Sequence, residues 1–124
     1  MAGPKLSSRQ QAQLAWLQTL PPKFEQFHKA IELMAIQQAD EVVIRGLGRR
    51  LDELKANAQG LGLGSLADTA GMMGMVARRG GGLQMKVRAL QEGLGSLRIN
   101  YDGALRAATT PEGDGHGGGN APGA

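Results

Sequence analysis

The residues best placed to take part in chemistry lie in the stretch of residues 49–68, RRLDELKANAQGLGLGSLAD. Asp52 and Lys55 are three residues apart, so a carboxylate and an ammonium group share one face of an α-helix. Small and polar side chains complete this face, whose members are Arg49, Asp52, Lys55, Ala56 and Gln59. Because small side chains leave a helix backbone accessible, the pattern favours docking of another protein. The plainer alternative is a solvated helix surface on which Asp52 pairs with Lys55 or Arg49.

The opposite side of the same segment is apolar and predicts how the helix is held. Apolar side chains recur at gaps of four, three, four and three residues, at Leu47, Leu51, Leu54, Ala58 and Leu61. This spacing predicts a helix with one buried face. The glycines at 60, 62 and 64 then predict a turn, and Ser65 is the expected N-cap of the next helix.

The segment resembles the active-site region of histidine-containing phosphotransfer (HPt) domains, the helical relay modules of two-component signalling. Asp52 stands at the position of the phosphoacceptor histidine, and Ala56 stands for the glycine that follows the family's lysine. The remaining matches are Leu54 and Lys55, the small pair Asn57 and Ala58, the turn residues Leu61 and Gly62, and the next helix start at Leu66, Ala67 and Asp68. The likeness is good over about twenty residues and looser in the flanking helices.

This resemblance implies binding without catalysis. Aspartate lacks the imidazole nucleophile, so we interpret the chain as a pseudo-HPt protein with no catalytic residue and no cofactor. Its implied partner is the receiver domain of a response regulator, or a histidine kinase, bound through the face of residues 49, 52, 55, 56 and 59. Asp52 would repel the acidic pocket of a receiver unless a metal ion or Lys55 intervenes.

His28 offers a third interpretation, a true phosphotransfer enzyme. The sequence after it, Lys29-Ala30-Ile31, does not reproduce the family's spacing. A partly buried histidine at the edge of a helix seam is the alternative that we favour. The second histidine, His116, lies in the glycine-rich segment after residue 110, where we expect no ordered neighbours and therefore no site.

Composition excludes several function classes. The chain has no cysteine, which removes disulfides and cysteine-based zinc sites. The glycine runs lack the Gly-Lys-Ser/Thr ending of a phosphate-binding loop, and two distant histidines predict no metal site. The net charge of +3 is dispersed and predicts no nucleic-acid binding. With no membrane-length apolar run and no signal peptide, we expect a cytoplasmic protein.

The periodicity predicts an all-α protein. We expect helices at residues 8–20, 22–38, 41–60, 66–79 and 83–108, with the last four forming an antiparallel four-helix bundle and the first a short cap. The domain would comprise residues 1–109. Residues 110–124 are rich in glycine and predict a disordered tail.

A phosphorylation-independent adaptor or structural subunit is the alternative function. Here the long last helix would supply the interface, so replacing Leu97 or Tyr101 by lysine would abolish a complex. Met73 is expected in the core, whereas Met72 or Met75 would contact a partner. The identity of the partner and the oligomeric state stay open.

Overall fold

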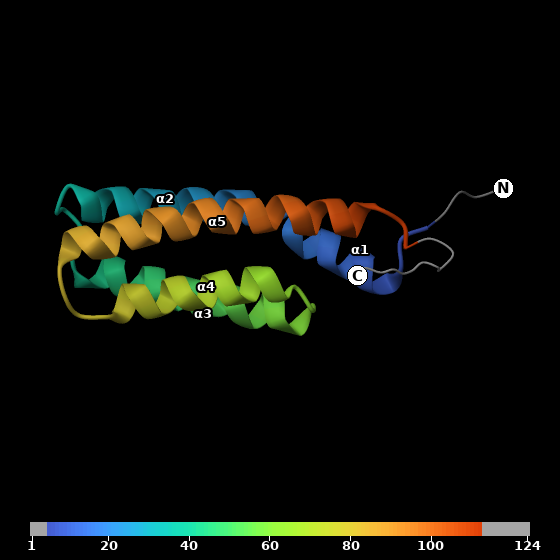
Figure 1. The fold of residues 1–124 in the computed structure, drawn as a ribbon, viewed down its shortest axis with the longest axis horizontal. Helices are drawn as coiled ribbons and strands as arrows, with labels where there is room; N and C mark the ends of the chain where they lie inside the picture. The colour runs from blue at the N-terminus through green and yellow to red at the C-terminus, as the bar shows by residue number, and fades with distance from the viewer. Residues whose placement is uncertain (1–4, 113–124) are drawn as a thin grey trace.

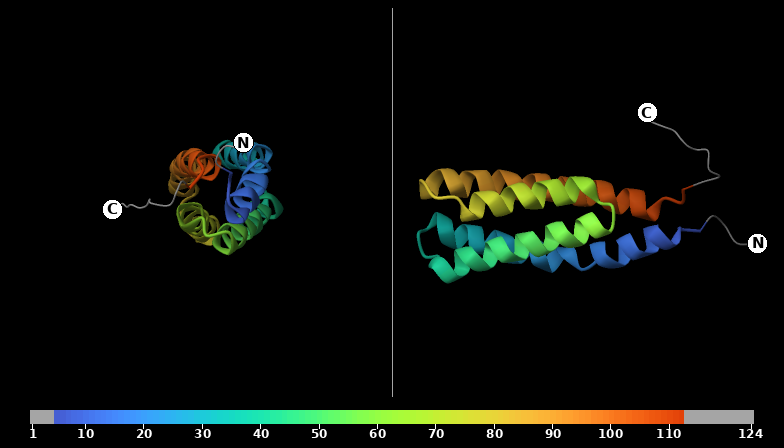
Figure 2. Two further views of the ribbon diagram at one scale, coloured as in Figure 1. Left: turned by 90° about the vertical axis from the view of Figure 1, so that its right-hand side faces the viewer. Right: turned by 90° about the horizontal axis from the view of Figure 1, so that it is seen from below.

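The computed structural model describes residues 5–112, which form five α-helices and no strand. The expected all-α class is therefore confirmed. The helices are α1 (Ser8–Leu17), α2 (Leu20–Ala35), α3 (Glu41–Gly60), α4 (Gly64–Arg78) and α5 (Leu83–Thr109). Helices α2 to α5 are joined by short turns and run in alternating directions, with α2 beside α5 and α3 beside α4 (Figure 1). Seen end-on, they surround a common centre (Figure 2).

The core is built from the apolar seams that the periodicity predicts. On α2 the five seam residues from Leu20 to Met34 are buried, and on α3 the four from Leu47 to Ala58 are buried. Leu61 lies at the end of the α3 seam and is only half-buried. The rings of Tyr101 and Phe24 pack in a T-shaped arrangement, with centroids 5.4 Å apart, and so join α5 to α2.

The buried seam of α5 corrects the expected interface of the adaptor hypothesis. Leu97 is fully buried in the core and Tyr101 is partly buried against it. Lysine at position 97 would place a charge in the core and unfold the bundle. A partner that binds α5 must therefore use the outer face of this helix.

Several helix ends differ from the expected positions for local reasons. Ser7 caps α1 in a capping box with Gln10, and Asp40 caps α3 by accepting from Val43 N, as expected. Ser65 is not the N-cap of α4, because Ala67 N already donates to Leu63 O and the helix starts at Gly64. The two prolines lie inside the first turn of α2 and do not separate it from Leu20.

Helix α1 closes one end of the bundle, as the expectation of a short cap requires. Helix α5 is longer than α3 and α4, and α1 packs on its protruding C-terminal part (Figure 1). The buried amide Nε2 of Gln10 donates to Ala107 O at 3.0 Å and to Thr110 O at 2.6 Å. Gln13 Nε2 donates to Leu61 O at 2.8 Å. Two side chains of α1 thus satisfy carbonyl groups at the C-terminal ends of α5 and α3.

Helix α2 ends earlier than expected because the chain turns left-handed at Gln37, where φ is 58°. Gln37 N donates to Met34 O and Gln38 N to Leu33 O, the two bonds of a Schellman motif. The equivalent residue after α3 is Gly62, with φ of 73° and the Arg9 guanidinium lying where a Cβ would be.

This difference predicts the effect of Gln37→Gly. The left-handed conformation costs an L-residue about 1 kcal/mol, which glycine avoids. We expect the variant to raise the free energy of unfolding by about 0.5 kcal/mol after the larger entropy loss of glycine on folding. Urea unfolding measures the change, and Gln38→Gly, one residue further on, is the control that should not stabilise. A loss of stability in Gln37→Gly would contradict the assigned helix end.

The predicted tail is only partly within the described residues. Thr110 caps α5 and its hydroxyl donates to Arg106 O. Residues 113–124, which contain most of the predicted tail, lie outside the residues that the structure describes, so their predicted disorder stays a prediction.

Candidate functional site

Asp52 forms an ion pair with a residue that the sequence interpretation did not include. Its Oδ2 accepts from Arg78 Nη1 at 2.6 Å, and the two side chains are 51% and 52% exposed. Arg78 belongs to the last turn of α4, so the pair bridges α3 and α4. The plainer alternative, in which Asp52 pairs with Lys55 or Arg49, is therefore wrong in its choice of partner. An exposed pair of this kind contributes at most about 1 kcal/mol to stability.

Three glycines bring α3 and α4 close together. The side chain of Asp52 lies over Gly74, where Oδ1 would be 3.0 Å from an added Cβ. Lys55 lies over Gly71 in the same way, with Cδ at 3.1 Å. In the other direction, the side chain of Arg78 on α4 lies over Gly48 on α3. A Cβ added at Gly48 would be 3.6 Å from Arg78 Cγ.

Each of these charged side chains therefore lies across the backbone of the neighbouring helix. Since α3 continues unbroken through Gly48, this glycine serves the close approach of α4 rather than a kink. The arrangement holds the three charged groups in a row along the α3–α4 seam.

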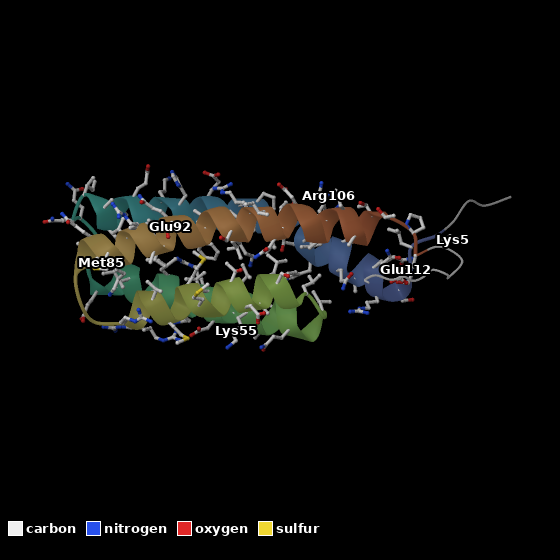
Figure 3. All side chains as sticks on the ribbon, in the orientation of Figure 1. Lys5, Lys55, Met85, Glu92, Arg106 and Glu112 are labelled. Carbon is white, nitrogen blue, oxygen red and sulfur yellow. The ribbon has the colours of Figure 1, made fainter. Side chains whose placement is uncertain are left out.

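The five predicted site residues all lie exposed on α3. Asp52 and Lys55 lean toward α4, and Figure 3 shows Lys55 at the outer edge of the bundle. Arg49, Ala56 and Gln59 lie on the part of α3 that is open to solvent. The predicted face is present as a surface, and whether a partner uses it stays a prediction.

Helix α4 adds residues to this surface that sequence reasoning placed elsewhere or left open. Met72 and Met75 are each 59% exposed, whereas Met73 is buried, as expected. We refer to Arg49, Asp52, Lys55, Ala56, Gln59, Met72, Met75 and Arg78 as the α3–α4 face. The spacing of Gly71, Gly74 and Arg78 mirrors that of Gly48, Asp52 and Lys55, and this signal could have identified Arg78.

Arg78 also changes the electrostatics of the predicted site. Because its guanidinium neutralises the Asp52 carboxylate, the unbalanced charges of the α3–α4 face are the cations Arg49 and Lys55. The expected repulsion between Asp52 and an acidic pocket is therefore reduced without a bound metal ion.

The remaining sequence features that could indicate a function are a histidine, a possible metal site and a possible membrane span. His28 lies on α2 with its side chain 51% exposed and Nε2 3.3 Å from the Glu32 carboxylate, so it is more open to solvent than the core seam beside it. Within residues 5–112, no three acidic, histidine or cysteine side chains are grouped as a metal site would require. None of the described helices is both long and apolar enough to cross a membrane.

Comparison of the chain with family models, with curated proteins and with solved structures finds no match.

Proposed function

We propose that the protein is a non-catalytic signalling component that binds a receiver domain of a response regulator through the α3–α4 face. The observation that carries the proposal is the Asp52–Arg78 pair at the position where the resembling HPt family has its reactive histidine. A paired carboxylate offers no nucleophilic nitrogen. The surface around it keeps two features that favour docking, a small exposed side chain at Ala56 and complementary charge.

Charge favours an acidic partner. With Asp52 neutralised, Arg49 and Lys55 give the centre of the face a positive potential, and the phosphorylation pocket of a receiver is rich in carboxylates. Complementary potentials of this kind raise the association rate and orient the partner.

The exposed methionines supply the apolar part of the interface. Met72 and Met75 lie on α4 next to the glycines that Lys55 and Asp52 cover. Unbranched thioether side chains adapt to partners of different shape. Two unbalanced cations beside adaptable apolar side chains suit a protein surface better than a small ligand.

Charge reversal on the face tests the proposal. We expect Lys55→Glu to weaken binding to purified receiver domains at least about tenfold, because a cation facing an acidic pocket becomes an anion. Arg78→Glu should weaken it further, since Asp52 then loses its counter-ion and gains a like charge. Isothermal titration measures both, and circular dichroism checks that each variant is folded.

Lys29→Glu on α2 is the matched control, because Lys29 is exposed and lies on another helix. It changes the net charge by the same amount and should leave affinity unaltered. The variant Asp52→His tests whether the rest of a phosphotransfer site remains. The assay measures transfer of a phosphoryl group from the aspartate of a receiver to the new imidazole. A wild-type protein that binds no receiver, together with an Asp52→His variant that neither binds nor accepts phosphate, would exclude the proposal.

The second candidate is the phosphorylation-independent adaptor. Exposed apolar side chains on the outer face of α5 favour it, since Met85 is 80% and Ile99 71% exposed. In this case charge reversal at Lys55 would leave partner binding intact, whereas Ile99→Lys would abolish it.

A further inference from the structure

The outer face of α5 carries residues that are arranged symmetrically about Ile99. Ile99 is 71% exposed near the middle of the helix. At equal distances on its two sides lie Ser96 and Asp102, Gly95 and Gly103, and Glu92 and Arg106. All of these residues are exposed. Because the distances are three, four and seven residues, the seven side chains share one helix face.

The members of each pair complement one another. Glu92 and Arg106 have opposite charge, the hydroxyl of Ser96 is a donor for the carboxylate of Asp102, and the two glycines have no side chain. Neither Glu92 nor Arg106 belongs to an ion pair within residues 5–112. An added Cβ at Gly95 or Gly103 would meet no atom within 4 Å, so both backbones are open to solvent.

We propose that this face binds a second copy of the chain, with the two α5 helices antiparallel and crossing at Ile99. In a two-fold interface, the contact of one residue with its mate occurs twice. Antiparallel pairing centred on residue 99 places each residue opposite the one at the equal distance on its other side. The arrangement therefore sets Glu92 against Arg106 of the second copy, twice, and Ile99 against itself.

Gly95 and Gly103 determine how closely the two α5 helices of the dimer can approach each other. With Gly95 facing Gly103 of the second copy on each side of Ile99, no side chain separates the backbones there. Close approach buries both Ile99 side chains, which are otherwise among the most exposed apolar residues of the bundle. Ser96 and Asp102 lie beside the glycines, at the edges of the interface.

The size of the face predicts a weak, reversible dimer. From residue 92 to residue 106 an α-helix rises about 21 Å. This length covers less surface than a standard interface, so we expect a dissociation constant of about 10 to 100 μM. The dimer leaves Asp52 and Lys55 free, because both lie on α3 whereas α5 packs on α1, α2 and α4.

Sedimentation equilibrium from about 5 μM to about 500 μM tests the interface over the expected range. The wild-type mass should rise from monomer to dimer. Glu92→Arg or Arg106→Glu should raise the dissociation constant at least about tenfold, because each creates two like-charge contacts. The double variant Glu92→Arg/Arg106→Glu exchanges the charges and should restore affinity to within about threefold.

The controls change the same charges elsewhere. Arg50→Glu and Glu53→Arg lie exposed on α3 and should leave the dissociation constant unchanged. A wild-type protein that remains monomeric throughout, or a double variant that is no tighter than the single ones, overturns the proposal. Capture of a different protein by a monomeric chain would also overturn it and assign the face to that partner.

A single cysteine gives an independent readout, since the chain has none of its own. Ile99→Cys places two thiols next to each other at the symmetry axis, and oxidation should join them into a covalent dimer. Gln26→Cys on α2 is the exposed control and should give little cross-linking at the same concentration. Equal cross-linking of the two variants would contradict the antiparallel crossing at residue 99.

Discussion

Replacing Gln10 by alanine is expected to lower the free energy of unfolding by about 3 kcal/mol. The side chain is 3% exposed and makes three hydrogen bonds, from Ser7 N to Oε1 and from Nε2 to Ala107 O and Thr110 O. Alanine removes all three and leaves these backbone groups without their partner at the junction of α1 and α5. Chemical denaturation, with the slope held common to all variants, measures the loss.

Two further variants separate the hydrogen bonds from the effect of mutating α1. Gln11→Ala removes one exposed bond, to Leu6 O, and should change stability by less than about 0.5 kcal/mol. Gln10→Glu keeps the shape but turns a carboxylate oxygen toward two carbonyl oxygens at neutral pH, so it should be at least as destabilising as alanine. If Gln10→Ala and Gln11→Ala were equally stable, α1 would not cap the end of α5.

The second large effect is that alanine should lower the stability of the protein at one glycine of α5 and raise it at another glycine two residues away. An added Cβ at Gly93 would lie 2.6 Å from Met73 Cγ, in the core between α4 and α5, whereas one at Gly95 meets nothing. We expect Gly93→Ala to destabilise by about 2 kcal/mol through overpacking, since the affected Met73 atom is close to its backbone. Gly95→Ala should stabilise the monomer by about 0.5 to 1 kcal/mol through helix propensity.

Thermal unfolding at low protein concentration, where the chain is monomeric, compares the two variants directly. Gly93→Ala should melt below the wild type and Gly95→Ala above it. The double variant Gly93→Ala/Met73→Ala also removes the side chain that the new methyl group would meet. Its loss of stability should therefore be smaller than the sum of the losses of the two single variants. Two variants that shift in the same direction would show that the packing of α5 on Met73 is incorrectly assigned.

The helices themselves were largely predictable because their signals are local. Helix α3 has its predicted bounds, since Asp40 accepts from Val43 N at one end and Gly62 closes the other. The start of α4 was not predictable from residue type. Ser65 is the better capping side chain, but the bond from Leu63 N to Ala58 O completes the turn early, and the helix begins before Ser65.

The candidate site was predictable on only one of its two helices. Periodicity identified the exposed face of α3, but the partner of Asp52 is 26 residues away on α4. Which residue lies opposite Asp52 depends on how α3 and α4 are aligned, and this alignment depends on the small residues Gly48, Gly71 and Gly74. A helical wheel of α3 alone contains no information about that alignment.

The capping role of α1 was also hidden from local reasoning. Gln10 is a polar residue, so its residue type alone predicts exposure. It is buried because the carbonyl groups of Ala107 and Thr110 require donors. These acceptors lie 97 and 100 residues further along the chain.

The contact between Gln10 and Thr110 has a consequence for synthesis on the ribosome. Helix α1 is made before the other described helices, yet the two carbonyl groups that Gln10 serves lie 97 and 100 residues further along and leave the exit tunnel much later. The α3–α4 hairpin needs only neighbouring residues and is free to form while the chain is still growing. We therefore expect the bundle to close from its middle outward, with α1 joining α5 only after Thr110 has left the tunnel.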